Sequence, residues 1–327
     1  MPPVVLPRIL TALVCLAACL LIACDRSATA TDAAPDAGAE QAPPRIVALA
    51  PALGVIVRDL GLEDRIVGRH TWDMALAPSI PMVGTHDDPD LEAILRLNPT
   101  HILVQEMETR VPGSLRRMAD EHAWTVWGFP LLTLDDIAIT TDELSMRFDP
   151  PPPRDRSRLD PTEHLSRPMP SARLADAWSD RGEPARNAGR VLLLAATDPP
   201  GAMGPGSFHH QLIERLGAQT ALSEGGPWQE LDHEDILRLA PDSIVLFRPA
   251  PVDHHAVGPR AAPTLAEARA ALGNIALLDI PAVRDGRLAL IDHPLGLLPA
   301  SSLAEVADDV ALAFDAWERA SVTAAEP

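Results

Sequence analysis

Two stretches of the sequence repeat one pattern, so the chain is expected to fold as two similar halves. Asp90–Val104 and Asp232–Leu246 share Asp, Glu, Ile, Leu, Arg, Leu, Pro and Ile at equivalent places. An Asp before an apolar stretch marks a helix N-cap, Pro marks the following turn, and a closing aliphatic run indicates a strand. Each copy therefore predicts a short helix, a turn and a buried β-strand.

The starts of the two halves also match. Arg45–Leu49 and Arg190–Leu194 are aliphatic runs, each followed by a helical stretch that closes at Leu60-Gly61 or Leu216-Gly217, where Gly suits the residue after a helix. Apolar runs without alternation are typical of parallel strands covered on both faces. The sequence therefore predicts an α/β protein with two similar Rossmann-like lobes and mainly parallel sheets. These are an N-terminal lobe over 45–132 and a C-terminal lobe over 189–320, followed by a disordered tail at 321–327.

The segment 133–188 is predicted to connect the lobes as a long helix. Residues 134–148 and 172–179 are helix-like, but the Pro-rich insert 149–170 contains four consecutive prolines at 150–153. Because Pro removes a backbone donor and clashes with the preceding turn, this insert cannot be regular helix. We expect an exposed, mobile loop to interrupt the connecting helix.

The first residues indicate export. Residues 1–24 combine Arg8, an apolar run that is too short to span a membrane and the end Leu21-Ile22-Ala23-Cys24. This end resembles a bacterial lipobox, which implies a lipoprotein signal peptide and lipidation of Cys24. The three Cys all lie in this segment, so the rest of the chain forms no disulfide. Residues 25–44 have too few large apolar groups to order and predict a flexible tether, which places the protein in the periplasm or cell envelope on a lipid anchor.

Composition excludes several functions. The formal net charge of −19 disfavours nucleic acid as a partner. The chain has no Lys and no Tyr, so it has neither a Walker A loop nor a Schiff-base lysine. It also has no GxSxG elbow or HExxH motif. We therefore expect no enzyme activity, no cofactor and no metal site.

Several motifs together resemble the periplasmic binding proteins for vitamin B12, iron-siderophores and heme. They are Pro81-Met82-Val83-Gly84, the segment 90–99, Gly204–Phe208, and Trp228 leading to Asp232-His233-Glu234. The resemblance covers about 45–320. It implies a class III binding protein: two α/β lobes joined by a long helix, monomeric, which delivers a ligand to the permease and ATPase subunits of an ABC importer.

The resemblance also implies docking residues. In this family a Glu from each lobe forms salt bridges with Arg residues of the permease, and Glu92 and Glu234 match these positions. Both begin equivalent predicted helices, so the pseudo-symmetry suits a two-fold symmetric membrane dimer. A simpler interpretation is that each Glu complements a helix dipole.

Family ligands lie between the lobes, at the carboxyl ends of the strands, where α/β sheets generally bind ligands. Trp72 and Trp228 are predicted stacking surfaces for a large flat ligand, and His70 and His86 are candidates for polar contacts. Heme binders commonly carry Tyr where this chain has Thr85, and the cleft segments contain Arg69 but few other bases. A corrinoid is therefore favoured, with a related iron chelate as the other choice. The predicted ligand-binding residues are Pro51, Ala52, Leu53, His70, Trp72, Thr85, His86, Ser207, Phe208 and Trp228.

Three alternatives stay open. One is a zinc or manganese binding protein of an ABC importer that uses His70, His86, His209 and an Asp, because such sites need three or four convergent ligands. Another is a metal-dependent hydrolase built from scattered His and Asp. The last is a lipoprotein that kept the fold and lost its transporter.

Overall fold

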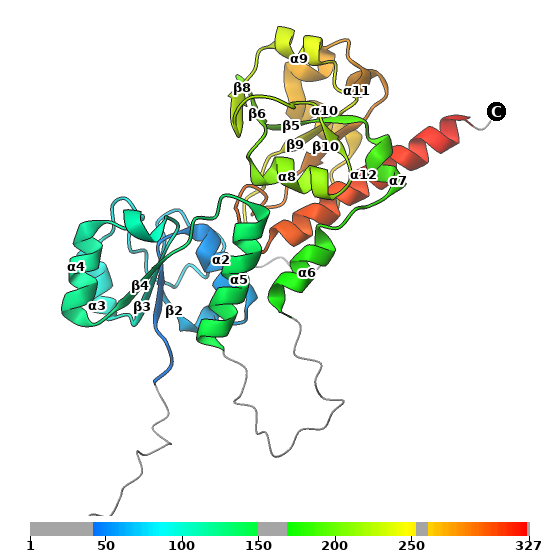
Figure 1. The fold of residues 1–327 in the computed structure, drawn as a ribbon. Helices are drawn as coiled ribbons and strands as arrows, with labels where there is room; N and C mark the ends of the chain where they lie inside the picture. The colour runs from blue at the N-terminus through cyan, green and yellow to red at the C-terminus, as the bar shows by residue number, and fades with distance from the viewer. Residues whose placement is uncertain (1–41, 150–168, 253–260, 326–327) are drawn as a thin grey trace, which may run out of the picture. The chain divides into compact units, whose positions relative to one another are not determined.

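The first half of the chain builds one parallel sheet (Figure 1). The computed structural model describes residues 42–149, 169–252 and 261–325, so the signal segment with Cys24, most of the tether and most of the Pro-rich insert lie outside the described residues. The strands are β1 (Ile46–Ala48), β2 (Ile66–Arg69), β3 (His101–Val104) and β4 (Thr125–Gly128), in the order β2-β1-β3-β4. They are connected by helices α2 (Pro51–Asp59), α3 (Leu91–Leu97) and α4 (Gly113–His122) and by short 3-10 helices at Glu63–Arg65 and Glu108–Arg110.

The second half builds a mixed sheet in which four strands are parallel, in agreement with the predicted α/β fold with mainly parallel sheets. Its strands are β5 (Arg190–Thr197), β6 (Pro200–Met203), β7 (Gln219–Thr220), β8 (Trp228–Glu230), β9 (Ser243–Phe247) and β10 (Leu288–Ile291). Their order in the sheet is β10-β9-β5-β6-β8, and β7 also pairs with β5. Strands β10, β9, β5 and β7 are parallel, but β6 and β8 run antiparallel. The hairpin of β5 and β6 causes this difference, because Thr197 pairs with Pro200 across a very tight turn. The helices are α8 (Phe208–Arg215), α9 (His233–Leu239), α10 (Leu265–Leu272), α11 (Pro281–Arg284) and α12 (Leu303–Ala325), with a 3-10 helix at Gly273–Leu277.

The two lobes contain the predicted repeat. Helices α3 and α9 have the same length, and the side chains of Asp90 and Asp232 cap them by accepting the N–H groups of Ala93 and Asp235. Asn98 and Ala240 end them in the left-handed conformation. The strands that follow, β3 and β9, each pair in parallel with the first strand of their lobe, β1 or β5. The two halves therefore share one β-α-β unit down to its caps.

Three helices connect the lobes in place of one uninterrupted helix. They are α5 (Leu134–Phe148), α6 (Pro170–Ala177) and α7 (Glu183–Asn187), so the helices predicted at 134–148 and 172–179 are both found. Helix α12 lies beside α6 and α7 (Figure 1), where Arg181 Nη2 lies 2.7 Å from Asp308 Oδ1. Helix α12 extends to Ala325, so residues 321–325 are helical rather than part of a disordered tail.

Each sheet is covered on both faces. In the first lobe, Ile46 and Leu103 join the core formed with α2 and α5, whereas Val47 and Ile102 pack on the other face. The second sheet packs against α8 and α12 on one face and against α9, α10 and α11 on the other. One buried cluster runs through both lobes, and the Arg215 guanidinium, in α8, lies 2.5 Å from Asp135 in α5. Of the helices in the described ranges, none combines the length and the apolar character needed to cross a membrane.

Candidate functional site

Two loops of the first lobe bring Trp72, His70, Thr85 and His86 together. The loop after β2 is joined to the second loop where the Thr71 N–H donates to the Gly84 carbonyl at 2.9 Å. Gly84 has a φ of +88°, and a Cβ there would overlap the Asp88 and Asp90 backbone, so this turn requires glycine. The Trp72 side chain is 73% exposed. The first lobe thus presents one exposed indole beside a pair of histidines.

The histidine pair is suited to polar contact with a ligand. Burial lowers the pKa of His70 below its usual value, and the nearby His86 imidazole lowers it further. The Nδ1 atom of His70 accepts the Trp72 N–H at 3.0 Å, which orients the ring. His86 lies 3.3 Å from Asp87 and stays partly exposed. His70 is therefore held as a neutral ring while His86 remains accessible.

Two predicted ligand residues belong to the core instead. Ala52 is 1% and Leu53 0% exposed within α2, because α2 packs this face against the sheet. Only Pro51, the first residue of α2, is partly exposed beside the carboxyl end of β1. In this structure Ala52 and Leu53 offer no surface to a ligand, and a helical hydrophobic pattern could have indicated their burial.

The second lobe brings Ser207, Phe208 and Trp228 together. The Gly204 N–H donates to the Pro227 carbonyl and so joins the loop before α8 to the start of β8. Ser207 caps α8 by accepting the His210 N–H at 3.1 Å, which places Phe208 at the first helical position. Trp228 is 52% exposed. The second lobe, like the first, presents an exposed indole next to a structured loop.

The Trp228 ring is positioned by the absence of a side chain at Gly201. A Cβ at Gly201 would overlap the six-membered ring of Trp228 and lie close to the Ala196 Cβ. The indole thus packs directly against Gly201 in β6, where a larger residue would displace it.

Replacing Gly201 with Ala should move the Trp228 ring and weaken ligand binding by roughly tenfold, the size of one stacking contact. Titration calorimetry with the ligand measures this loss. Gly226→Ala is the matched control, because nothing but the Trp228 carbonyl at 4.0 Å lies near its Cβ. Equal affinities for Gly201→Ala and Gly226→Ala would contradict a role for the ring position.

Arg248 is a candidate ligand residue that the sequence analysis missed. It is exposed directly after β9, and its N–H donates to the Ile291 carbonyl, so it lies at the carboxyl ends of β9 and β10. Phe247, the preceding residue, packs its ring at a tilt against His209, which in turn contacts Phe208. The position of Arg248 immediately after a predicted strand could have identified it from the sequence. Arg69, the base noted in the sequence, is buried and donates to the Ile80 and Asp73 carbonyls.

The predicted metal ligands do not converge. Within residues 42–149, 169–252 and 261–325, no group of three His, Cys, Asp or Glu side chains is close enough to hold a metal ion. His209 is buried against Phe208 and Phe247, and its Nε2 lies 2.7 Å from the Gly296 carbonyl. Burial lowers the pKa of His209 to about 4, against the opposing effect of that hydrogen bond. His209 is therefore a neutral core residue and not a partner of His70 and His86.

The docking candidates occupy equivalent places. Glu92 and Glu234 are exposed in the first turns of α3 and α9, and the Glu92 side chain is 80% exposed, 3.7 Å from Arg96. Each carboxylate also lies where it favours its own helix dipole. The structure thus presents both carboxylates to solvent in matching local settings.

Solved structures of periplasmic binding proteins have the same fold. The periplasmic heme-binding protein HutB of Vibrio cholerae aligns with a TM-score of 0.59 at 17% identity, over 82% of this chain and 98% of that chain. The vitamin B12 binding protein BtuF of Vibrio cholerae aligns with a TM-score of 0.57 at 18% identity, over 84% of this chain and 98% of that chain. A periplasmic heme-binding protein from Pseudomonas aeruginosa aligns with a TM-score of 0.58 at 21% identity, over 84% of this chain and 93% of that chain.

This chain has the periplasmic binding-protein fold. No protein-family model matches the sequence, and no curated protein matches it. The likeness therefore concerns the fold, and it agrees with the motifs from which the resemblance was first drawn. Proteins with this fold in the comparison are named as binding proteins rather than as enzymes.

Proposed function

We propose that the chain is the extracytoplasmic solute-binding protein of an ABC importer. It binds a corrinoid or a related iron chelate between its two lobes and delivers it to the permease. The observation that carries this proposal is the pair of exposed indoles, Trp72 and Trp228, each held by a structured loop of a different lobe. An exposed indole is unfavourable in water unless it serves a surface contact, and a flat macrocycle supplies a matching face.

The chemistry of the site supports binding without reaction. His70 and His86 provide polar contacts in the first lobe, and Thr85 directly precedes His86 in the same loop. Ser207 and Phe208 border the second lobe, where Arg248 adds a positive charge for an acidic group on the ligand. In the described part of the chain, His70 contacts the Trp72 main-chain N–H and His86 contacts the Asp87 carboxylate, so these contacts form no histidine–hydroxyl pair.

The rest of the proposal concerns export, membrane anchoring and the transporter partners of the chain. We propose that the chain reaches the periplasm through the signal segment 1–24, is lipidated at Cys24, and acts as a monomer. Glu92 and Glu234 would contact Arg residues of the permease, and the ATPase subunits would drive release of the ligand. The matching first turns of α3 and α9 support this assignment.

Titration of the purified chain with cobalamin, heme, ferric siderophores and zinc tests the proposal. We expect one of the first three to bind with a stoichiometry of one and to quench Trp fluorescence. Zinc is expected to show no stoichiometric binding, since the described ligands do not converge. Tight binding of zinc alone would favour the metal-importer alternative, and absence of binding by all four would contradict the proposal.

Replacing either Trp228 or Trp72 with Ala should raise the Kd of that ligand by roughly thirtyfold, or about 2 kcal/mol, which is the size expected for a Trp that becomes buried only when the ligand binds. Isothermal titration of each variant checks this. Leu277→Ala is the control, because Leu277 is 82% exposed and distant in sequence from every predicted ligand residue. Unchanged affinity in both Trp variants would show that the indoles are not the binding surface.

A further inference from the structure

A buried carboxyl group directly follows the exposed Trp72 indole in the chain. Asp73 is 4% exposed, whereas Trp72 is 73% exposed. The Oδ1 atom of Asp73 accepts the N–H groups of Ala75 and Leu76 at 2.8 and 2.9 Å. The loop after β2 therefore turns around a side chain that is buried in the first lobe, while the neighbouring side chain projects into solvent.

The main chain on both sides of the indole is fixed by the same residue and its neighbours. The Asp73 N–H donates to the His70 carbonyl at 3.0 Å, and the Trp72 N–H donates to His70 Nδ1. The Arg69 guanidinium donates to the Asp73 carbonyl at 2.6 Å and to the Ile80 carbonyl at 2.9 Å. Asp73 is thus held through its side chain, its N–H and its carbonyl.

Helix α2 leaves room for the second oxygen of this carboxyl group. A Cβ on Gly54, inside α2, would lie 2.9 Å from Asp73 Oδ2, which is closer than two such atoms approach. A glycine inside a helix lowers its stability by about 1 kcal/mol relative to alanine. The helix therefore gives up stability at the position where it admits the carboxyl group.

The surroundings of the Asp73 carboxyl group are unfavourable to it. Its Oδ2 atom is buried and has no hydrogen-bond partner among the described residues. Burial raises the pKa of Asp73, and neither its two hydrogen bonds nor the nearby guanidinium groups of Arg69 and Arg58 cancel this rise. An unpaired buried polar atom costs about 1–3 kcal/mol, which an apolar side chain of similar size would avoid. Asp73 therefore contributes to the conformation of the loop rather than to the stability of the lobe.

We propose that Asp73 is a positioning residue of the ligand site: its buried carboxyl group fixes the loop that presents the Trp72 indole to the solute. A loop that is ordered before binding loses little conformational entropy on binding, which favours affinity. The role of Trp72 in this inference rests on the proposed solute-binding function. The order of the loop itself is measured without any solute.

Amide hydrogen exchange followed by NMR on the full chain tests the order of the loop. Asp73→Ala should speed exchange of the Trp72 amide by about tenfold, although the acceptor of that amide, His70, is unchanged. Asp73→Asn should restore the slow exchange, because its side-chain oxygen can still accept the Ala75 and Leu76 N–H groups.

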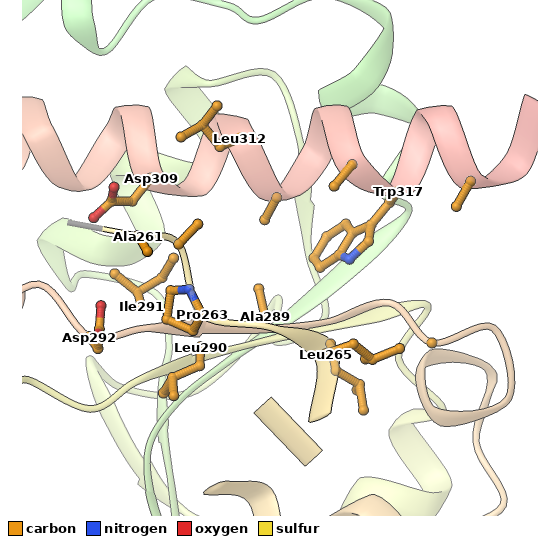
Figure 2. A pocket seen from close by; sticks show the side chains of 16 residues that line it. Ala261, Pro263, Leu265, Ala289, Leu290, Ile291, Asp292, Asp309, Leu312 and Trp317 are labelled. Atoms are coloured by element: carbon orange, nitrogen blue, oxygen red, sulfur yellow. The ribbon is translucent and has the colours of Figure 1, made fainter. Parts of the chain in front are cut away.

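Two other tryptophan amides report whether each lobe stays folded. In the first lobe, the Trp124 N–H donates to the Ala119 carbonyl near the end of α4. In the second lobe, Trp317 points from α12 toward β10 and lines a hollow of about 290 Å³ between them (Figure 2). Exchange of both amides should be the same in Asp73→Ala and in the unmodified chain.

A variant in α2 tests the space that the carboxyl group occupies. Gly54→Ala should also speed exchange of the Trp72 amide, because the added Cβ would displace Asp73 Oδ2. Gly113→Ala, at the start of α4, is the matched control, since the nearest atom to its Cβ is Arg117 Nη1 at 3.5 Å. Equal exchange of the Trp72 amide in these two variants would count against the proposal.

Titration with cobalamin as the probe connects the order of the loop to binding. The Kd should rise about tenfold in Asp73→Ala and return in Asp73→Asn. Unchanged exchange at Trp72, equal acceleration at Trp72 and Trp124, or failure of Asp73→Asn to restore slow exchange would each overturn the proposal. An unchanged Kd beside faster exchange would also overturn it. Failure of the unmodified chain to bind cobalamin would count against the proposed corrinoid ligand, and the exchange results would still decide whether Asp73 orders the loop.

Discussion

Uptake of the ligand should be lost when Glu92 and Glu234 are both replaced by arginine, while the affinity of the chain for the ligand stays the same. Both carboxylates are exposed in the first turns of α3 and α9, so neither supports the core. Reversing both charges would place Arg opposite the Arg residues proposed on the permease, and like charges across an interface cost several kcal/mol. Transport of radiolabelled ligand into cells or proteoliposomes, measured beside a titration of the purified variant, separates the two effects.

A control variant carries the same change of net charge elsewhere. Glu121→Arg with Asp285→Arg alters two exposed acids, one in each lobe, and should leave uptake near that of the unmodified chain. If both double variants transport equally well, the docking assignment is wrong. If Glu92→Arg with Glu234→Arg loses ligand affinity as much as uptake, these residues act in folding or binding instead.

Acidification from pH 7 to pH 4 should cost the chain about 3 kcal/mol of unfolding free energy through His209 alone, because burial lowers its folded-state pKa from 6.5 to about 4. The unfolded chain binds this proton near pH 6.5 and the folded chain does not. The contribution of His209 to the free energy of unfolding is therefore complete above pH 6.5. It is lost as the pH falls toward 4 and changes little below that. Urea unfolding at a series of pH values measures it.

His209→Gln isolates this effect. A Gln amide stays neutral at every pH and can still donate to the Gly296 carbonyl that His209 contacts. The difference in stability between the unmodified chain and this variant should therefore change by about 3 kcal/mol across the range. His122→Gln, at an exposed helix position, should follow the unmodified chain. A His209→Gln variant with the full acid loss would contradict the burial of a neutral imidazole.

The sequence predicted the repeated unit well because its signals are local. An Asp before α3 and α9, the Pro that follows each helix and the unalternating strands β3 and β9 depend on residues a few positions apart. The ends of α2 and α8 at Leu60-Gly61 and Leu216-Gly217 follow the same logic: Gly61 and Gly217 have φ values of +78° and +94°, which only glycine adopts without strain.

The features that the sequence did not predict depend on distant partners. His209 was grouped with possible metal ligands because its acceptor, the Gly296 carbonyl, lies 87 residues away. Ala52 and Leu53 follow the first strand in sequence, but the packing of α2 turns them into the core. The antiparallel β6 and β8 depend on pairing that no local pattern encodes, since Trp228 pairs with Met203 across a segment that contains α8 and β7.

The site itself was predicted in part. Main-chain hydrogen bonds join the segments of Trp72 and His86 in one lobe and those of Ser207 and Trp228 in the other, and the ligand-binding role of these residues stays a prediction. The sequence analysis named Arg69 and not Arg248 as the base of the cleft segments, although Arg248 directly follows β9 and the Arg69 guanidinium donates to two main-chain carbonyls. Exposure, which a sequence does not give, distinguishes these two bases.

Hydrogen–deuterium exchange of the chain with and without its bound solute is the measurement that most directly locates the binding surface. The loops around Trp72 and His86 in one lobe, and around Phe208 and Trp228 in the other, should gain protection together when the solute is added. Protection confined to a single lobe, or to the hollow between β10 and α12, would contradict capture between two matching halves.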